Sequence, residues 1–380
     1  MGISGTPRRW TARLGNTEFR LTSPAPRAMW RQVFAADPTA LPSQSPEWLD
    51  CVCASGMWRD ASRLYERDGD RPLVLPMVVR SRNGGRLSME ASLPPGWGPG
   101  GILAPGGPRV DDVRAVAVDV AGSHALQVTI RPGFRTGACW AESGVPGAVV
   151  VPRVVHVLDL EGGFDTVWSQ RFTAETRKGL RRAERRAEQA GVTVECGNSP
   201  ALVADFYNVY LRWLEGRARQ RPLPGWAVRW GGRHSDPRRK FELVAAALGD
   251  ACLIYVARLD DRPVAADFSV RHEDNMVTWR GMSDGDAGAR LRLNELLLQM
   301  SIQGACEQGC RYYEMGESGG VASLERFKLR LGARPVPLAE YRLERLPLTT
   351  VQTRVTSLRR GVERAVSRAR EIVQSSPASS

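Results

Sequence analysis

Two stretches of this chain share one pattern: LYERDGDRPLVLPMVVR at residues 64–80 and IYVARLDDRPVAADFSVR at residues 254–271. Each is an apolar-aromatic run, an acidic turn that ends in Asp-Arg-Pro, and a second apolar run, which is the pattern of a β-hairpin. A further turn and a further apolar run follow each copy, at 87–92 and at 276–283. Solenoid repeats recur every roughly 20–50 residues, whereas these copies lie about 190 residues apart. The repeat therefore predicts two similar lobes, and chance similarity between two ordinary hairpins is the alternative.

Length and composition are those of a globular protein with room for two domains. The chain has 380 residues, of which 42% are hydrophobic and 25% are charged. No apolar run reaches the roughly 18 residues that span a bilayer, and the N-terminus lacks the apolar core of a signal peptide. We therefore expect a cytoplasmic protein. The net charge of +12 implies an anionic partner such as a nucleic acid, a membrane surface or a phosphorylated substrate.

The cysteines and histidines do not predict a metal site. The seven cysteines show no paired metal spacing, and the four histidines are isolated from one another. The chain also lacks an HExxH motif, a Walker lysine loop, a Rossmann fingerprint and a Ser-His-Asp arrangement. Reduced, partly buried thiols are the expected state. A nucleophilic cysteine stays open, although no histidine is placed to activate one.

Helical and strand-like segments alternate along the chain, which predicts an α/β fold with helices on mixed sheets. Besides the two hairpins, we expect strands at 125–130, 149–160, 192–196, 276–282, 311–315 and 336–343. We expect helices at 45–55, 111–121, 173–190, 201–217, 239–248, 289–308 and 321–331.

These segments divide the chain into four parts. Residues 1–25 are polar and carry Arg and Pro, so we expect a flexible N-terminus. Residues 26–150 would form the first lobe and residues 151–346 the second. Residues 350–380 would hold a basic amphipathic helix and a disordered tail. That helix, over 351–373, either docks onto the body or contacts anionic lipid or RNA.

The expected helix at 173–190 has one strongly basic face. Six cations lie on it in two rows at i,i+4 spacing, which are Arg177, Arg181 and Arg185, and Lys178, Arg182 and Arg186. Backbone N–H groups and the helix dipole at the first turn also favour anions. Because the cations repel one another unless an anion is present, this face is a candidate phosphate-binding surface. A solvated helix face is the alternative.

A second cluster lies near the end of the second lobe. RYYEMGESGG at 311–320 predicts a strand that ends in a Gly-rich turn, where a ligand can approach the backbone closely. The helix that follows carries Arg326 and Lys328, and Glu314 lies near the mouth of the turn. Lysine occurs at three positions, which are Lys178, Lys240 and Lys328. Because Arg fills every other basic position, a surviving lysine is a candidate for a role that a guanidinium cannot fill.

Taken together, these motifs resemble the Fem family of aminoacyl (peptidyl) transferases, which are tandem-lobe members of the GNAT acyltransferase superfamily. LPPGWGPGGIL at 93–103 is similar to that family's Leu-Pro-Phe-x-x-x-Gly-Gly-x-Leu segment. The basic helix is similar to its Arg-Lys-x-Ile-Arg-Lys-Ala stretch, and Phe327-Lys328 to its C-terminal Phe-Lys pair. With 43–48 and 281–309, the resemblance covers most of residues 40–345. It implies two tandem GNAT-like lobes and transfer of an acyl group, often an amino acid from aminoacyl-tRNA, to an amine.

The resemblance also implies roles for individual residues. Lys328 would lie near the reacting ester or the terminal phosphates of the RNA and could stabilise the leaving ribose oxygen. Glu314, a water or the substrate could take the proton from the amine. Arg177 and Lys178 would bind phosphate of a nucleotide-linked or lipid-linked cell-wall precursor. The candidate catalytic residues are therefore Lys328 and Glu314, and the candidate ligand-binding residues are Arg177, Lys178, Arg181, Arg182, Tyr313, Asn294, Arg326 and Trp97.

The chain departs from the family pattern at two places. The coiled-coil arm of some members is absent, and residues 212–239 form a Pro/Gly/Trp-rich insert instead. SDGDAGAR at 283–290 stands where a CoA-using GNAT would carry an Arg/Gln-x-x-Gly-x-Gly/Ala pyrophosphate loop, and it is not that loop. The second departure weakens acyl-CoA as the donor.

The leading hypothesis is an aminoacyltransferase that uses charged tRNA and acts on a peptidoglycan precursor or a small amine-bearing metabolite, in cell-wall or antibiotic biosynthesis. It needs no cofactor besides its donor. One alternative is an acyl-CoA-dependent N-acyltransferase of polysaccharide or secondary metabolism. The other is a non-catalytic RNA- or membrane-binding protein on this fold. The expected partners are charged tRNA, an anionic or amine-bearing acceptor and, through residues 351–373, the inner face of the membrane.

Overall fold

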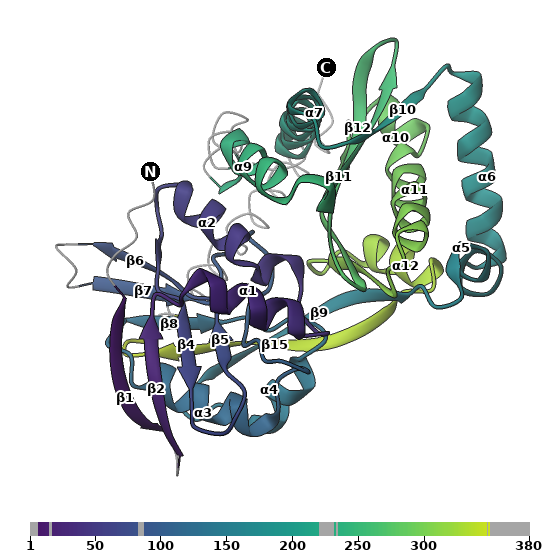
Figure 1. The fold of residues 1–380 in the computed structure, drawn as a ribbon. Coiled ribbons are helices and arrows are strands. Elements are labelled where there is room, and N and C mark those ends of the chain that lie inside the picture. Colours follow the sequence, from purple (N-terminus) through teal and green to yellow (C-terminus); the bar gives the residue numbers. More distant parts are fainter. Residues whose placement is uncertain are drawn as a thin grey trace, which may run out of the picture.

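The structure of the chain is a computed structural model that describes residues 7–14, 17–82, 87–219, 232, 235–347 and 349. In Figure 1 the first half, purple to blue, lies at lower left, and the second half, teal to green, at upper right. Two long strands, β9 (Val149–Asp159) and β15 (Arg334–Glu344), run from one half to the other. The basic helix expected at 350–380 lies outside the described residues.

A four-stranded sheet contains part of the segment that was expected to be flexible. Its order is β1 (Arg8–Leu14), β2 (Thr17–Ser23), β4 (Arg63–Glu66) and β5 (Leu73–Leu75). The prediction of a flexible N-terminus is therefore wrong for residues 8–14 and 17–23. The reason is apolar alternation among the arginines, which buries Leu14, Phe19 and Leu21 in the core of the first half.

The larger sheet has eleven strands and continues through both halves. Its order is β10-β11-β12-β13-β14-β9-β15-β8-β7-β6-β3. The strands not yet bounded are β3 (Arg59–Asp60), β6 (Val78–Arg82), β7 (Leu87–Ala91), β8 (Gln127–Ile130), β10 (Thr193–Gly197), β11 (Cys252–Leu259), β12 (Arg262–His272), β13 (Asn275–Ser283) and β14 (Tyr312–Glu317). Because β15 pairs with β9 on one side and with β8 on the other, this late strand joins the two halves.

Both repeated hairpins form, but the first is irregular. β11 and β12 pair with each other within the large sheet, and β4 and β5 pair within the small one. The strand expected at 73–80 is broken at Pro76 and Met77 into β5 and β6, which belong to different sheets. Pro76 has no N–H to donate to a ladder, which accounts for the break.

Helices of the first half pack around its two sheets. They are α1 (Arg27–Ala36), α2 (Pro46–Ala54), α3 (Val110–Ala121) and α4 (Gly137–Ser143), with a short 3-10 turn at Pro42–Gln44. α2 begins as its sequence predicts, with Pro46 in the first position and the Ser45 hydroxyl accepting a hydrogen bond from the Trp48 N–H at 3.1 Å.

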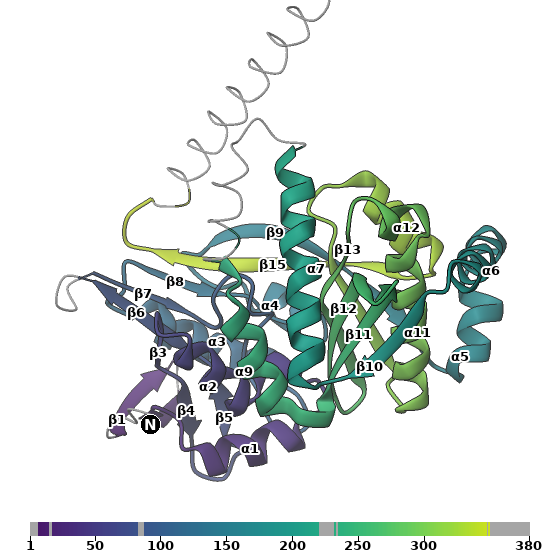
Figure 2. The ribbon, with the colours of Figure 1, turned by 90° about the horizontal axis from the view of Figure 1, so that it is seen from above.

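Helices of the second half cover both faces of the sheet. They are α5 (Gly163–Thr166), α6 (Ala174–Gln189), α7 (Pro200–Arg219), α9 (Arg238–Leu248), α10 (Ala287–Arg290), α11 (Leu293–Glu307) and α12 (Ala322–Arg330), with a π-helical turn at Val167–Arg171 and a 3-10 turn at Gly249–Ala251. α7 and α9 lie on one side of β11 and β12, and α11 lies on the other (Figures 1 and 2). The single helix expected at 289–308 is interrupted at Arg292, whose φ of 58° is left-handed.

An aromatic core joins the two halves. Trp48 of α2 packs against Trp279 of β13 with ring centroids 4.8 Å apart, and Trp97 packs against both. Phe241 of α9 lies 5.1 Å from Trp279, and α2 packs on α9. Since these rings come from both halves, their burial holds the halves in one arrangement.

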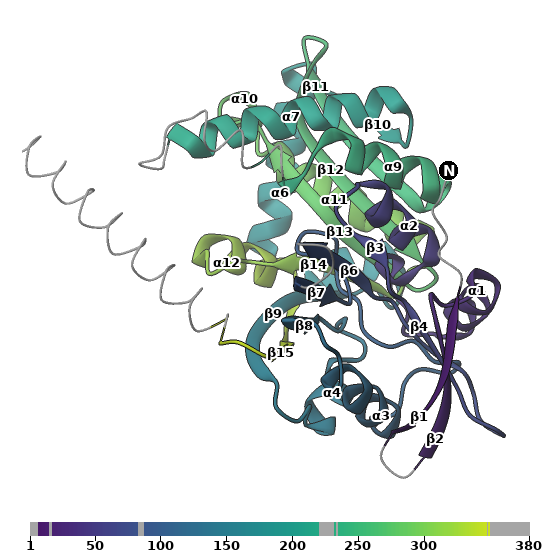
Figure 3. The ribbon, with the colours of Figure 1, turned by 90° about the vertical axis from the view of Figure 1, so that its left-hand side faces the viewer.

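The large sheet opens between two of its central strands. β13 and β14 run parallel and pair at three positions, Asn275 with Tyr312, Met276 with Tyr313 and Val277 with Glu314. Beyond Val277 and Glu314 these two strands are not paired with each other. Figure 3 shows α12, which follows β14, at this end of the sheet. The separation leaves a wedge that is available to a ligand.

Candidate active site

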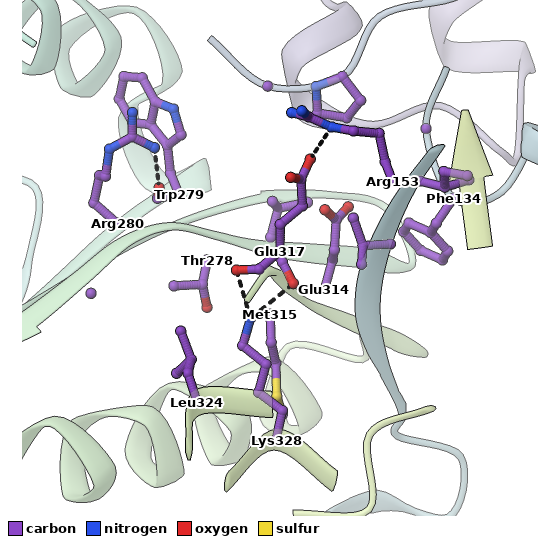
Figure 4. Close-up of a pocket in the computed structure, with 18 of the residues that line it drawn as sticks. Phe134, Arg153, Thr278, Trp279, Arg280, Glu314, Met315, Glu317, Leu324 and Lys328 are labelled. Atoms are coloured by element: carbon purple, nitrogen blue, oxygen red, sulfur yellow. Dashed lines mark hydrogen bonds and ion pairs between the residues drawn. The ribbon is translucent and has the colours of Figure 1, made fainter. Parts of the chain in front are cut away.

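A cavity of about 420 Å³ occupies the wedge between β13 and β14. Thr278, Trp279 and Gly281 of β13 line one side, and Glu314 and Gly316 of β14 line the other. The first half also contributes, through the loop that holds Gly96 and Pro99 and through the segment at 131–134. The cavity therefore lies at the junction of the halves (Figure 4).

Lys328 forms part of the cavity wall, and two backbone carbonyl groups hold its ammonium group. Its Nζ donates hydrogen bonds to the carbonyl oxygens of Gly316 at 2.9 Å and Glu317 at 3.1 Å. Gly316 has a φ of 65°, a conformation that glycine adopts without strain. Because an ammonium has three N–H donors, one remains for a ligand. Burial lowers the pKa of Lys328 to about 8, while Glu314 and Glu317 oppose this shift.

Two buried carboxyl groups line the same cavity. Glu314 and Asp267 are 6% and 3% exposed, and burial raises the pKa of each to about 7. The carboxylate of Glu317 further raises the pKa of Glu314, and Lys328 lowers it. Within the described residues, Glu314 Oε2 has no hydrogen-bond partner. Both groups can therefore gain or lose a proton near neutral pH.

Arginines line the remaining wall. Arg131 and Arg153 come from the first half and from β9, and Arg280 from β13. Arg153 Nε bonds Glu317 Oε1 at 3.0 Å, and Figure 4 shows these two side chains meeting above Glu314. Arg131 pairs with the buried Glu340. The cavity thus places cations and proton-accepting carboxyls around one volume, an arrangement suited to a reaction that separates charge.

A buried lysine fixes the loop of the first half against the cavity. Lys240 Nζ donates to Gly96 O at 2.7 Å and pairs with Asp236 Oδ1 at 2.5 Å. The same ammonium lies 4.6 Å from the ring centroid of Trp97 and 5.0 Å from that of Trp279. Gly96 O also accepts the Trp279 indole N–H at 3.1 Å. The loop is therefore held by contacts that the second half supplies.

Three of the sequence-predicted residues line the cavity: Lys328, Glu314 and Asn294. Tyr313 lies behind the wall, where its hydroxyl donates to Ser301 Oγ at 2.7 Å and accepts from Thr278 Oγ1 at 2.8 Å. Trp97 belongs to the aromatic core that joins the halves. Arg326 is exposed and bonds Ala322 O of its own helix.

The predicted phosphate-binding face of α6 divides into three environments. Arg177 donates to the carbonyl oxygens of Trp168, Ser169 and Phe172, so it closes the preceding turn. Arg181 stacks on the Trp168 ring. Lys178 and Arg182 line a second pocket of about 260 Å³, together with Arg292, Arg330 and Phe327. Since Phe327 also lines the cavity, the two pockets are neighbours.

Sequence reasoning missed Asp267, Thr278, Arg153 and Arg280. Asp267 stands in the second repeated hairpin, where a lone carboxylate between Ala266 and Phe268 breaks an apolar run. This interruption of the apolar run could have identified Asp267. Burying a carboxylate in a strand costs free energy unless the carboxylate has partners or a function.

Two further observations concern metal binding and membrane spans in the described part of the chain. Its His, Cys, Asp and Glu residues form no group of three or more that could hold a metal ion. None of its helices combines the length and the apolarity needed to cross a bilayer.

We predict that Glu314→Gln makes the free energy of unfolding less dependent on pH. A folded-state pKa of about 7, raised from 4.5, stabilises the fold fully below pH 4.5 and loses that contribution as pH rises to 7. The free energy of unfolding, measured with urea, should fall from pH 5 to pH 8 in the wild type. In Glu314→Gln this fall should be smaller by on the order of 2–3 kcal/mol. Glu325→Gln, on the exposed surface of α12, is the control, and equal slopes for the wild type and Glu314→Gln would contradict the assignment.

Part of the sequence matches a known domain family, and the fold is similar to those of solved structures. Residues 174–329 match the acetyltransferase (GNAT) domain family. The solved structure of FemX is 11% identical, with a TM-score of 0.58 over 87% of this chain and 98% of FemX. A conserved protein of unknown function from Bacteroides thetaiotaomicron is 10% identical, with a TM-score of 0.51 over 84% and 97%.

A third solved structure is a tandem GNAT protein from the clavulanic acid biosynthesis pathway. It is 14% identical, with a TM-score of 0.48 over 89% of this chain and 98% of that one. The comparison with curated proteins finds no match. Residues 174–329 therefore match the acetyltransferase (GNAT) domain family, and the chain as a whole has the fold of FemX.

Proposed function

We propose that this chain is an N-acyltransferase that moves an aminoacyl group from aminoacyl-tRNA to an amine, in a peptidoglycan precursor or a small metabolite, and forms an amide. The observation that carries the proposal is Lys328, a buried cation with one free N–H, in the same cavity as Glu314 and Asp267. Such a cavity suits attack of an amine on an ester, which develops negative charge on oxygen and releases protons.

Each residue has a defined part in the proposed reaction. The amine attacks the ester carbonyl, and the tetrahedral intermediate carries an oxyanion. Lys328 stabilises the negative charge as it develops on that oxyanion or on the leaving ribose oxygen. A carboxyl with a pKa near 7 takes the proton that the amine loses. The walls supplied by both halves bring the two substrates together, which alone supplies much of the rate.

The turn before α10 supports tRNA over acyl-CoA as the donor. Asp284 Oδ1 accepts the Gly288 N–H at 2.9 Å, so a carboxylate occupies the position where a CoA-using GNAT would bind a diphosphate. Asp284 is buried and lies within 4 Å of Arg212 and Arg262. Because Asp284 already accepts the Gly288 N–H, that backbone donor is not available to a diphosphate.

The exposed face of α6 supports an RNA partner. Lys178, Arg181, Arg182, Arg185 and Arg186 are exposed on it, and none of the ion pairs of the described residues involves them. The pocket that holds Lys178 and Arg182 adjoins the cavity through Phe327. A phosphate chain bound on α6 could therefore reach the cavity with its aminoacyl end.

The function is tested with the full chain and a mixture of charged tRNAs. The acceptors are a nucleotide-linked muropeptide carrying a free side-chain amine, and a panel of small diamines. Mass spectrometry should find an acceptor whose mass has grown by one aminoacyl residue, and RNase treatment before the reaction should abolish that product. A product that forms from acetyl-CoA, survives RNase and never forms from charged tRNA would replace this function with the acyl-CoA alternative.

We predict that Lys178→Glu/Arg182→Glu lowers tRNA affinity about ten-fold or more near physiological salt, because two phosphate contacts become repulsive. Fluorescence anisotropy of labelled tRNA, measured over a salt series, should also show a shallower salt dependence in the variant. Arg109→Glu/Arg114→Glu, at the start of α3, changes the net charge equally on a different surface and serves as the control. Equal losses in both variants would mean that tRNA binds by net charge rather than at α6.

A further inference from the structure

One part of the cavity is open because the residue that lines it, Gly281, has no side chain. Gly281 of β13 lies directly opposite Asp267 of β12 in the ladder, so a side chain at 281 would share a face with the Asp267 carboxyl. A Cβ at Gly281 would lie 2.9 Å from Asp267 Oδ1 and 3.5 Å from Asn294 Oδ1. Two oxygen acceptors therefore converge on a space that glycine leaves open, and all three residues line the cavity.

A chain of hydroxyl groups holds Asp267 in this position. Thr278 donates to the Tyr313 hydroxyl, which donates to Ser301 Oγ at 2.7 Å. Ser301 donates to Ser269 Oγ at 3.1 Å, and Ser269 donates to Asp267 Oδ2 at 2.6 Å. Every donor in the chain points toward Asp267, the arrangement that an ionised carboxylate requires. These hydroxyl groups bond Oδ2 of Asp267, whereas Oδ1 of Asp267 lies beside Gly281.

A second buried carboxyl of the cavity has an oxygen without a partner in the described part of the chain. Glu314 Oε2 is buried without a hydrogen bond among the described residues. Buried acceptors of this kind are rarely left unsatisfied, so an unpartnered carboxylate oxygen in a cavity indicates a donor that arrives with the ligand. Ammonium is a donor with three N–H groups and no acceptor, and its charge complements two carboxyls.

We infer that Asp267, Asn294 and the open space at Gly281 form a subsite for a primary alkylammonium group, the reacting amine of the acceptor. This inference rests on the amide-forming reaction proposed above and names the part of the cavity that receives the nucleophile. Asp267 accepts one proton from the ammonium, which frees the nitrogen lone pair for attack on the ester carbonyl. As the C–N bond forms and the C–O bond breaks, the second proton passes to the leaving oxygen. The Asp267 proton is then released to water.

The subsite is tested by a binding experiment that needs no donor. Cadaverine is titrated into the full chain at pH 8, with binding measured by calorimetry, and 1-pentanol serves as the uncharged comparison. Asp267→Asn and Gly281→Ala should each weaken cadaverine binding roughly ten- to hundred-fold, the effect of losing one charge-assisted hydrogen bond. Gly281→Ala retains every charge and fills the space, so it tests the subsite even if Asp267→Asn folds poorly. Asp274→Asn, in the exposed turn of the same hairpin, should bind like the wild type.

Two further measurements distinguish a subsite for the acceptor amine from one for the donor. Wild-type affinity for cadaverine should fall as pH drops below 7, where Asp267 becomes protonated, and the fall should be smaller in Asp267→Asn, where Glu314 is the remaining buried carboxyl that titrates in this range. Alanine methyl ester, which resembles the aminoacyl donor, should bind more weakly than cadaverine, and tighter binding would assign the subsite to the donor and overturn our inference. Unchanged cadaverine binding in Asp267→Asn or in Gly281→Ala would also overturn it. If cadaverine binds as expected but no product forms from charged tRNA, then the amine subsite stands and only the proposed donor is wrong.

Discussion

Replacing Lys328 with methionine should lower the rate of acyl transfer by about 10²–10³-fold, the usual effect of removing one preorganised donor from an oxyanion site. Methionine has a similar length and no charge, so the side chain can still fill its place between α12 and β14. The loss should appear in kcat rather than in the KM for either substrate, because the negative charge that Lys328 contacts develops during the reaction. Steady-state kinetics with the donor and acceptor found in the charged-tRNA assay check this expectation.

Two control variants show whether the charge or the position of Lys328 matters. Lys328→Arg keeps the cation, but a planar guanidinium is wider than an ammonium and directs its N–H donors differently, so we expect partial rescue at most. Leu329→Ala changes an exposed side chain on the same helix and should keep full activity. The pH profile offers a further check: with a pKa of about 8, Lys328 loses its proton above that pH, and the wild-type rate should fall there. Full turnover by Lys328→Met would exclude the role.

The sequence was most informative where the structure depends on local patterns. The helix that starts at Ser45 and the turn that leads to Lys328 rest on capping residues and glycines a few positions away, and the structure has both. The two repeated hairpins were also predicted, because alternation and turn chemistry are local. Lys328, Glu314 and Asn294 came from one contiguous part of the chain, and the fold places all three on one cavity.

The sequence was least informative where a side chain's partner is distant. Arg177 was expected to bind phosphate, but it bonds three carbonyl groups of the irregular turn at 168–172, whose geometry no periodicity predicts. Asp267 was overlooked because Ser301 and Tyr313, which connect it to the cavity wall, lie more than 30 residues away. Burial, which raises its pKa, is likewise a property of the assembled fold.

The three lysines of this Arg-rich chain allow the prediction made from composition to be compared with the structure. A lysine that arginine has not replaced was expected to do something that a guanidinium cannot. Lys240 and Lys328 are both buried, at 1% and 4% exposure, and burial lowers the pKa of each to about 8. In both sites a compact ammonium lies among closely spaced carbonyl or carboxylate oxygens. The third lysine, Lys178, is exposed on α6, so burial distinguishes two of the three positions.

Replacing Asp236 with alanine should destabilise the fold by about 3–5 kcal/mol, because it leaves the charge of Lys240 buried without a counter-ion. The side chain of Lys240 is fully buried, and Asp236 is its ion-pair partner at 2.5 Å. Asp236 also bonds Arg280 at 3.2 Å, so its removal frees a second cation beside the cavity. Urea unfolding can be followed by tryptophan fluorescence, since Trp97 and Trp279 lie beside Lys240.

The double variant Asp236→Ala/Lys240→Met decides whether the cost comes from the unpaired charge. Breaking a buried pair from one side is costly, whereas replacing both partners with apolar groups is often close to neutral. We therefore expect the double variant to recover at least half of the stability that Asp236→Ala loses. Asp111→Ala, which breaks an exposed pair with Arg114, should cost about 0.5 kcal/mol or less. If the double variant is no more stable than Asp236→Ala, then Asp236 stabilises the fold through Arg280 and Tyr210 rather than through Lys240.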